Sequence, residues 1–167
     1  MKLINLLLLF SLPLFSACES PTSTTQATSP SKPPTNAKAQ AAINNIMTVY
    51  KSPTCQCCSR WITHLEANGF KVKAINVKDV SPYKQKAGLT PTLASCHTGF
   101  INGYVVEGHV PASDIKRMLK EKPDIKGLTV PAMPVGTPGM EMGDRKDPYD
   151  VISFDKNGKT KVYKSYR

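Results

Sequence analysis

The sequence predicts an α/β domain in which helices flank a central mixed β-sheet. Three observations support this fold class. Over residues 46–122, apolar residues switch between the two-residue alternation of a strand and the 3.6-residue period of a helix. Residues 127–148 are rich in Gly, Pro and Met and predict a long ordered loop, and residues 151–166 have the pattern of a β-hairpin. We therefore expect one folded domain over residues 41–167.

The first part of this domain reads as strand, helix, strand. Residues 46–50 are β-branched and aromatic, which is typical of a strand. Residues 57–68 have one apolar helical face, formed by Cys58, Trp61, Ile62 and Leu65. Gly69 follows, where the end of a helix favours a left-handed residue. Alternation over 70–77 then predicts a second strand.

The next part reads as helix, two strands, helix. Residues 81–87 predict one or two helical turns, and residues 92–96 and 104–107 predict the third and fourth strands. A second long helix is expected at 113–122, where Pro123 ends it. The complete order before the loop is therefore β-α-β-α-β-β-α.

This order, with a Cys motif opening the first helix and Thr90-Pro91-Thr92 before the third strand, resembles the thioredoxin fold. In that fold a cis-proline beside the Cys motif starts the corresponding strand, and Pro91 matches its position. The resemblance implies a thioredoxin-like domain. It also implies that Cys96, five residues after Pro91, approaches the motif.

The N-terminal segment predicts export. Lys2 precedes an apolar run over residues 3–17 that is short for a membrane span, so we expect a signal peptide at 1–17. Phe15-Ser16-Ala17-Cys18 resembles the lipobox of bacterial lipoproteins, which implies lipidation of Cys18. Residues 18–40 are dominated by Ser, Thr, Pro, Ala and Lys and predict a disordered tether.

These features predict a lipoprotein that faces the periplasm and is attached to a membrane through its N-terminal lipid. Glu19 is not the Asp that favours inner-membrane retention, so the outer membrane is preferred; the alternative is cleavage near Ala17 and a soluble periplasmic protein. The net charge is +10, but the basic residues form no run of five, so we expect no nucleic-acid partner. The single apolar run excludes a polytopic membrane protein.

The candidate chemistry is concentrated in Cys55-Gln56-Cys57-Cys58. Cys55 and Cys57 lie at or before the first turn of the expected helix, where the unpaired N–H groups and the helix dipole favour thiolates, whereas Cys58 faces inward. Thiolates are both redox nucleophiles and soft-metal ligands. Purely structural disulfides are the alternative, but adjacent Cys57 and Cys58 pair only with strain.

Methionine and histidine add further donors. Three methionines fall in the Gly/Pro-rich loop: Met133, Met140 and Met142. Thioethers together with thiolates select Cu(I) over most biological metals, whereas a zinc site favours two C-x-x-C pairs and this chain has one. His97 and His109 are either ligands or proton carriers. For His64, beside the apolar helix face, we expect a structural role.

Several motifs occur in one order: Cys55-Gln56-Cys57-Cys58 with Trp61 and His64-Leu65, Ser95-Cys96-His97-Thr98, Gly103 to Ala112, and Pro138-Gly139-Met140-Glu141. This set resembles the CopG-type family of periplasmic copper-resistance proteins, over about residues 46–166. The resemblance implies copper binding by a thioredoxin-like domain. It assigns metal-ligand roles to Cys55, Cys57, Cys58, Cys96, His97, His109, Met140 and Met142.

Two functions of different classes follow. In the first, a tethered protein of copper handling or resistance binds Cu(I), with more than one ion where thiolate sulfur bridges, acts on copper redox state, and exchanges copper with periplasmic donor or acceptor proteins. A passive copper chaperone is a variant without redox activity. In the second, the chain is a thiol–disulfide oxidoreductase acting on protein disulfides, with Cys55 attacking and Cys58 resolving. The sequence leaves open whether the protein is an enzyme.

Overall fold

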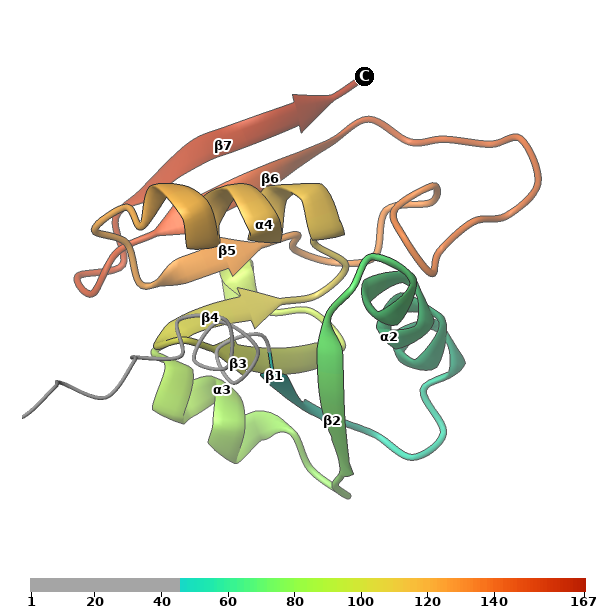
Figure 1. The fold of residues 1–167 in the computed structure, drawn as a ribbon, viewed down its shortest axis with the longest axis horizontal. Coiled ribbons are helices and arrows are strands. Elements are labelled where there is room, and N and C mark those ends of the chain that lie inside the picture. Colours follow the sequence, from blue (N-terminus) through green and yellow to red (C-terminus); the bar gives the residue numbers. More distant parts are fainter. Residues whose placement is uncertain (1–45) are drawn as a thin grey trace, which may run out of the picture. The chain divides into compact units, whose positions relative to one another are not determined.

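The computed structural model describes residues 46–167. The predicted signal peptide at 1–17, the lipidation of Cys18 and the tether at 18–40 lie outside the described residues. The elements follow in the order β1 (Ile46–Lys51), α2 (Gln56–Ala67), β2 (Lys71–Asn76), α3 (Ser81–Ala87), a 3₁₀ turn (Pro91–Leu93), β3 (His97–Ile101), β4 (Tyr104–Glu107), α4 (Ala112–Glu121), β5 (Gly127–Thr129), β6 (Tyr149–Phe154) and β7 (Thr160–Tyr166) (Figure 1).

The strands form one mixed sheet with the order β2-β1-β3-β4-β5-β6-β7. The pairs β1–β2 and β4–β5 are parallel, and the other neighbours are antiparallel. The predicted α/β class, with a central mixed sheet flanked by helices, is confirmed. The order β2-β1-β3-β4 is compatible with the thioredoxin-like arrangement that the element order suggested.

The helices divide between the two faces of the sheet. One apolar cluster joins α2 and α4 to β1, β3 and β4, with Trp61, Leu65, Ile115 and Met118 fully buried. A smaller cluster on the other face includes Ala87 at the end of α3 and Leu93 of the 3₁₀ turn, packed near Val105 and Phe154. Each full burial of a large apolar side chain contributes about 1.5–3 kcal/mol, so both faces hold the sheet in place.

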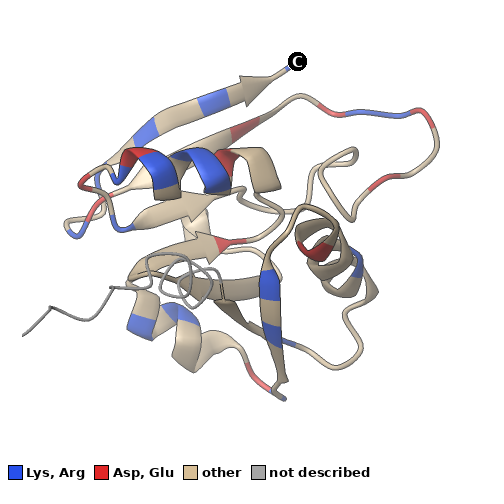
Figure 2. Cartoon of the chain, viewed as in Figure 1, with Lys and Arg blue, Asp and Glu red and all other residues tan. Residues whose placement is uncertain are grey.

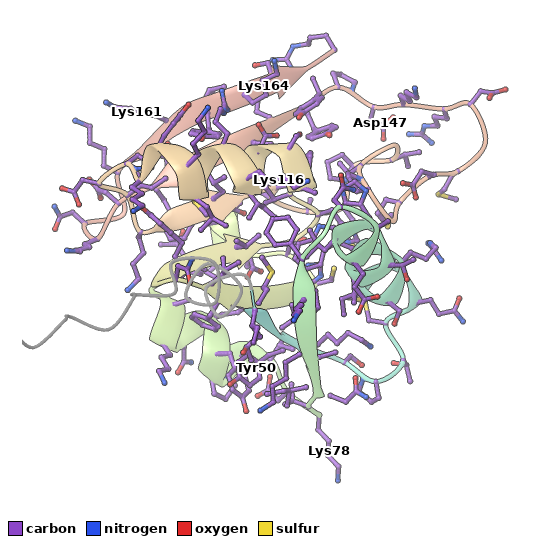
Figure 3. The ribbon with its side chains drawn as sticks, viewed as in Figure 1. Tyr50, Lys78, Lys116, Asp147, Lys161 and Lys164 are labelled. Atoms are coloured by element: carbon purple, nitrogen blue, oxygen red, sulfur yellow. A yellow bond between two sulfur atoms is a disulfide. The ribbon has the colours of Figure 1, made fainter. Side chains whose placement is uncertain are left out.

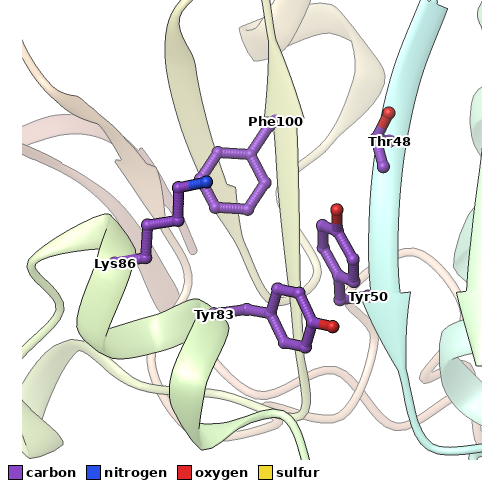
Figure 4. Close-up of a pocket in the computed structure, with 5 residues that line it drawn as sticks. All are labelled: Thr48, Tyr50, Tyr83, Lys86 and Phe100. Carbon is purple, nitrogen blue, oxygen red and sulfur yellow. The ribbon is translucent and has the colours of Figure 1, made fainter. Parts of the chain in front are cut away.

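Helix α3 is anchored to its face of the sheet by aromatic contacts. The rings of Tyr83 and Tyr50 stack with their centroids 3.7 Å apart, and Phe100 of β3 meets Tyr50 edge-on at 6.0 Å. These three rings, with Thr48 and Lys86, line a pocket of about 270 Å³ (Figure 4). Offset and edge-to-face ring pairs are favourable beyond their buried area, which fixes α3 against β1 and β3.

Two expectations about strands were wrong. Residues 92–96 do not form the third strand: Pro91 begins a 3₁₀ turn and the strand starts at His97. The N–H of Ser95 donates to the Glu107 carboxylate at 2.6 Å instead of to a neighbouring strand. Within the expected loop at 127–148, the structure has a short strand, β5, between β4 and β6. The three residues of β5 are too few to show the alternation of apolar and polar side chains by which a strand is predicted.

The basic residues are spread over several elements, among them β2, α3, α4 and β7, as the sequence suggested (Figure 2). Lys161 and Lys164 lie on β7, Lys116 on α4 and Lys78 beyond the end of β2 (Figure 3). Within residues 46–167, no helix combines the length and the apolar character that crossing a membrane requires.

Candidate metal centre

The candidate site is built on the first turn of α2. Cys55 is the N-cap residue in extended conformation, and its sulfur accepts a hydrogen bond from the Cys58 N–H at 3.4 Å. Cys58 is fully buried beside Trp61, whereas Cys55 and Cys57 are half-buried. The helix N-terminus therefore presents its N–H groups and its positive dipole end to sulfur, which stabilises thiolates.

Four sulfur atoms meet at this turn. Cys55 and Cys58 are joined as a disulfide, and Cys57 and Cys96 are free thiols. The Cys57 sulfur lies 3.4 Å from that of Cys55, and the Cys96 sulfur lies 3.5 Å from that of Cys58. All four lie within 4.8 Å of one another. The structure thus brings Cys96, just before β3, against a motif 38 residues earlier in the chain.

His109 is oriented toward the same sulfur. Its Nε2 lies 3.1 Å from the Cys96 Sγ, and its Nδ1 lies 2.8 Å from the Pro138 carbonyl oxygen. Because a carbonyl only accepts, Nδ1 carries the hydrogen and the Nε2 of the neutral ring faces the sulfur with its lone pair. A backbone carbonyl that fixes the tautomer in this way is a common partner of a metal-binding histidine.

His97 is fully buried at the start of β3. Its ring lies 4.3 Å from the Trp61 ring and 5.2 Å from the His109 ring, between centroids. Its Nδ1 is 3.3 Å from the Cys96 sulfur, and among the described residues its Nε2 has no hydrogen-bond partner. An unpaired buried nitrogen costs about 1–3 kcal/mol. The His97 nitrogen that faces the Cys96 sulfur is Nδ1, so Nδ1 is the candidate donor to a soft metal ion at this sulfur.

Burial sets the protonation states of the site. It raises the pKa of Cys96 to about 12, and the neighbouring Cys57 adds to this effect. It lowers the pKa of His97 far below the ordinary value, and the charges of His109 and Lys84 act in the same direction. Burial also lowers the pKa of His109. At neutral pH the metal-free site therefore holds two neutral imidazoles, the form that binds metal, beside a protonated Cys96.

The methionines behave differently from the cysteines and histidines. Met142 exposes 61% of its surface and Met133 exposes 49%, so both reach into solvent. Met140 is half-buried in the turn that follows Gly139. The ligand roles assigned to Met140 and Met142 stay predictions. His64 has a structural contact, because its Nε2 accepts the Ala112 N–H at the start of α4, at 3.2 Å.

Gly139 allows the loop at residues 130–148, which contains the three methionines, to pack against α2. Its carbonyl accepts from the Arg60 Nε at 3.0 Å, and its φ is +84°. A Cβ at this position would lie 2.6 Å from the Trp61 nitrogen and 2.7 Å from the Cys57 carbonyl oxygen. Only glycine allows this approach, and through it the loop brings Pro138 to His109.

Gly139→Ala is accordingly expected to lower the free energy of unfolding by about 2–4 kcal/mol, since backbone overlap adds to the cost of positive φ. Thermal or urea unfolding of the reduced protein measures the loss. Gly143→Ala is the matched control, because Gly143 has φ +58° in the same loop and open space around it. Equal losses in the two variants would show that the close approach to α2 contributes nothing.

Two residues beside the site, Glu107 and Lys84, were not among the candidate residues predicted from the sequence. Glu107 ends an apolar strand, is fully buried, and forms an ion pair with Lys84 of α3. A signal was present: Glu107 alternates with Val105, which predicts the same buried face of the sheet.

The comparisons with known proteins agree with this geometry. A family model described as "Protein of unknown function, DUF411" matches residues 93–140. Two solved structures are titled "Copper resistance protein copG", Form 2 and Form 1; they are 48% and 49% identical to this chain, with TM-scores of 0.70 and 0.69. The alignments cover 73% and 72% of this chain and 98% and 96% of those chains. The chain belongs to the CopG family. No curated protein matches it.

Membership of the CopG family confirms the resemblance that the motifs suggested. The segment matched by the family model contains Cys96, His97, His109 and Met140, whereas the Cys motif of α2 precedes it. The solved CopG structures are matched over nearly their whole length. The donor cluster and the family relationship together support a function related to copper.

Proposed function

We propose that this CopG-family chain binds Cu(I) and acts in copper handling or resistance. The observation that carries the proposal is the meeting of four cysteine sulfurs within 4.8 Å, next to two neutral histidines. Thiolate sulfur is the donor that Cu(I) prefers, and the solved relatives are titled as copper resistance proteins. Copper is then the cargo or substrate of the protein.

Cys96 belongs to two groups of donors. One is the set of four cysteines, and the other is Cys96 with His97 and His109. A sulfur shared by two groups supports binding of more than one Cu(I), because a thiolate can bridge two ions. Full binding requires reduction of the Cys55–Cys58 disulfide, in which two electrons and two protons convert the S–S bond into two thiols.

An anaerobic Cu(I) titration of the reduced protein against a chromophoric chelator tests the proposal, and native mass spectrometry of the same sample counts the ions. Tight binding of one or more Cu(I) is expected. Weak binding by fully reduced protein, with all four thiols accessible to alkylation, would refute the copper function.

Copper affinity is expected to fall on acidification. The pKa of Cys96 is raised to about 12, so at neutral pH Cu(I) displaces its proton. Each displaced thiol proton weakens apparent affinity about tenfold per pH unit lowered. Because the pKa values of His97 and His109 are lowered, both rings stay neutral down to the pH range in which an ordinary histidine titrates. Above that range the two histidines therefore add nothing to the pH dependence of the copper affinity. Affinities measured between about pH 8 and about pH 6.5 give the slope; a slope unchanged by Cys96→Ser would contradict this assignment.

Export and attachment to a membrane through Cys18 are also part of the proposal. Their support is the lipobox-like sequence and the Ser/Thr/Pro-rich segment after it. Incorporation of a labelled fatty acid into the full chain, lost in Cys18→Ala, tests them. Label retained in that variant would place the lipid elsewhere.

A second candidate is thiol–disulfide exchange with protein substrates. The Cys55–Cys58 disulfide at a helix N-terminus favours it, since Cys55 is half-buried and within reach of a substrate while Cys58 is fully buried. Against it, the Cys57 sulfur lies 3.4 Å from Cys55 and competes for the same bond. Turnover of a disulfide substrate by copper-free protein supports this function, and absence of turnover removes it. Redox activity on copper is tested separately, by following oxidation of bound Cu(I) with and without the thiols.

A further inference from the structure

A buried carboxylate lies behind the candidate site. Glu107, the last residue of β4, is fully buried and pairs with Thr98 of β3 in the antiparallel ladder. Because side chains alternate along a strand, Glu107 and Thr98 lie on the α3 face of the sheet while His97 lies on the α2 face. The carboxylate therefore touches none of the candidate ligands directly.

Its hydrogen bonds go to the residues on either side of the ligands. The Ser95 N–H donates to Glu107 Oε1 at 2.6 Å, and the Thr98 hydroxyl donates to Oε2 at 2.7 Å. Between these two residues the chain contains only Cys96 and His97. Lys84 of α3 completes the arrangement, since its ammonium contacts Oε1 and lies 3.2 Å from the Thr98 hydroxyl oxygen.

The backbone around Cys96 lies before the strand ladder and is held by separate hydrogen bonds, from the Ala132 N–H to the Ala94 carbonyl at 3.4 Å and from the Gly108 N–H to the His97 carbonyl at 3.2 Å. The segment joins the 3₁₀ turn to β3, and the carboxylate accepts the Ser95 N–H that a neighbouring strand would otherwise accept. Gly108, with φ +69°, presses against this segment: a Cβ there would lie 2.6 Å from the Ser95 side chain. Glu107, Gly108 and His109 are consecutive in the chain. Glu107 accepts the hydrogen bond of the Ser95 N–H, Gly108 packs closely against Ser95, and His109 is itself a candidate ligand.

A contribution to folding stability is by itself a weak explanation for a buried charge pair such as Glu107 with Lys84. Removing a charge pair from water costs free energy that the pairing often only balances, and apolar residues of similar size frequently do as well. Fixing the position of neighbouring groups is a purpose that the geometry supports, because both hydrogen bonds fall directly beside candidate ligands.

We propose that Glu107 is a positioning residue for copper binding: with Lys84, it holds the Cys96–His97 backbone so that the Cys96 sulfur meets the sulfurs of α2. This inference rests on the proposed Cu(I) binding. It predicts that losing the carboxylate weakens the site while every ligand remains present.

Glu107→Leu is expected to lower Cu(I) affinity about 10- to 100-fold, the usual effect of removing an outer partner of a metal ligand. Glu107→Gln is expected to stay within a few-fold of the wild type, because its amide oxygen still accepts from Ser95 and its NH₂ can donate to Thr98. Thr98→Val, which removes one hydrogen bond at nearly constant volume, is expected to have an intermediate effect. If Glu107→Leu fails to fold, Thr98→Val still tests whether this hydrogen-bond network positions Cys96.

A control separates positioning from general destabilisation. Tyr83→Ala loosens the same helix, α3, by removing the ring that stacks on Tyr50, and leaves the carboxylate network intact. It is expected to lower the melting temperature but not the Cu(I) affinity. If Tyr83→Ala weakens copper binding as much as Glu107→Leu does, the effect belongs to folding and the inference is wrong.

A double-mutant cycle shows whether Glu107 acts through Cys96. Glu107→Leu is expected to weaken Cu(I) binding much less in a Cys96→Ser background than in the wild type. Equal fold-losses in both backgrounds would overturn the inference. Failure of the wild-type protein to bind Cu(I) would refute the proposed function, whereas tight wild-type binding that Glu107→Leu leaves unchanged would refute only the positioning role.

Discussion

Cys96→Ser is expected to lower Cu(I) affinity by at least about 100-fold, beyond what the loss of an outer partner costs. Its sulfur is the atom that belongs to both donor groups, with Cys58 at 3.5 Å on one side and His109 at 3.1 Å on the other. A serine hydroxyl is a hard donor that Cu(I) binds poorly. The number of bound ions is expected to fall as well, because a bridging atom is lost. Anaerobic chelator competition and native mass spectrometry measure both quantities.

Cys57→Ser provides the graded comparison. Cys57 belongs only to the four-cysteine group, so its loss is expected to reduce affinity or stoichiometry less than the loss of Cys96. Ser59→Ala, an exposed change on the same helix turn, is the neutral control. Unchanged binding in Cys96→Ser would remove Cys96 from the site and leave a site confined to α2.

Oxidation is expected to have an effect of similar size. With the Cys55–Cys58 disulfide intact, Cys57 and Cys96 are the only thiols among residues 46–167, so two of the four cysteine donors of the site are lost. Disulfide sulfur is a far weaker ligand than thiolate, because the thiolate is the form that binds metal. Titrating the same preparation before and after reduction is expected to show a loss of about 100-fold or more in the oxidised form.

The double variant Cys55→Ser/Cys58→Ser is the matched control for oxidation. It lacks the same two thiolates and cannot form this disulfide, so its copper binding is expected to be weak under both redox conditions. Oxidised protein that binds Cu(I) as tightly as reduced protein would contradict the assignment of Cys55 and Cys58 as ligands. It would leave the disulfide free for exchange with other proteins.

These two results would link copper binding to thiol state. Exported proteins meet an oxidising compartment, in which free thiols are converted to disulfides unless something protects them. For an exported form of this chain, Cu(I) and oxidation would then compete for the same sulfurs. Cys57, whose sulfur lies 3.4 Å from Cys55, is placed to take part in either process.

Local patterns predicted the part of the site on α2. The spacing of Cys58, Trp61 and Leu65 places the three side chains on one helical face, and the structure buries all three. This prediction succeeds because helix periodicity depends only on neighbours three and four residues away. The same reasoning failed for β5, whose three residues are held by pairing with β4 and β6. Short strands of this kind depend on partners distant in the sequence.

Residue types and local patterns were enough to predict the α/β class, the Cys motif at a helix start, the set of candidate donors and the resemblance to the CopG family. How these donors come together was visible only in the folded chain. The fold brings the Cys96 sulfur into contact with the Cys58 sulfur, and the Pro138 carbonyl orients the His109 ring. Met142 is exposed to solvent, and Glu107 lies behind the candidate ligands. Residue types and helix periods are local properties, so they can be recognised without the fold. The contacts of His109 with Pro138 and of Cys58 with Cys96 join residues that are 29 and 38 positions apart in the chain. These contacts depend on sheet pairing and on a loop that can approach α2 only because residue 139 is glycine.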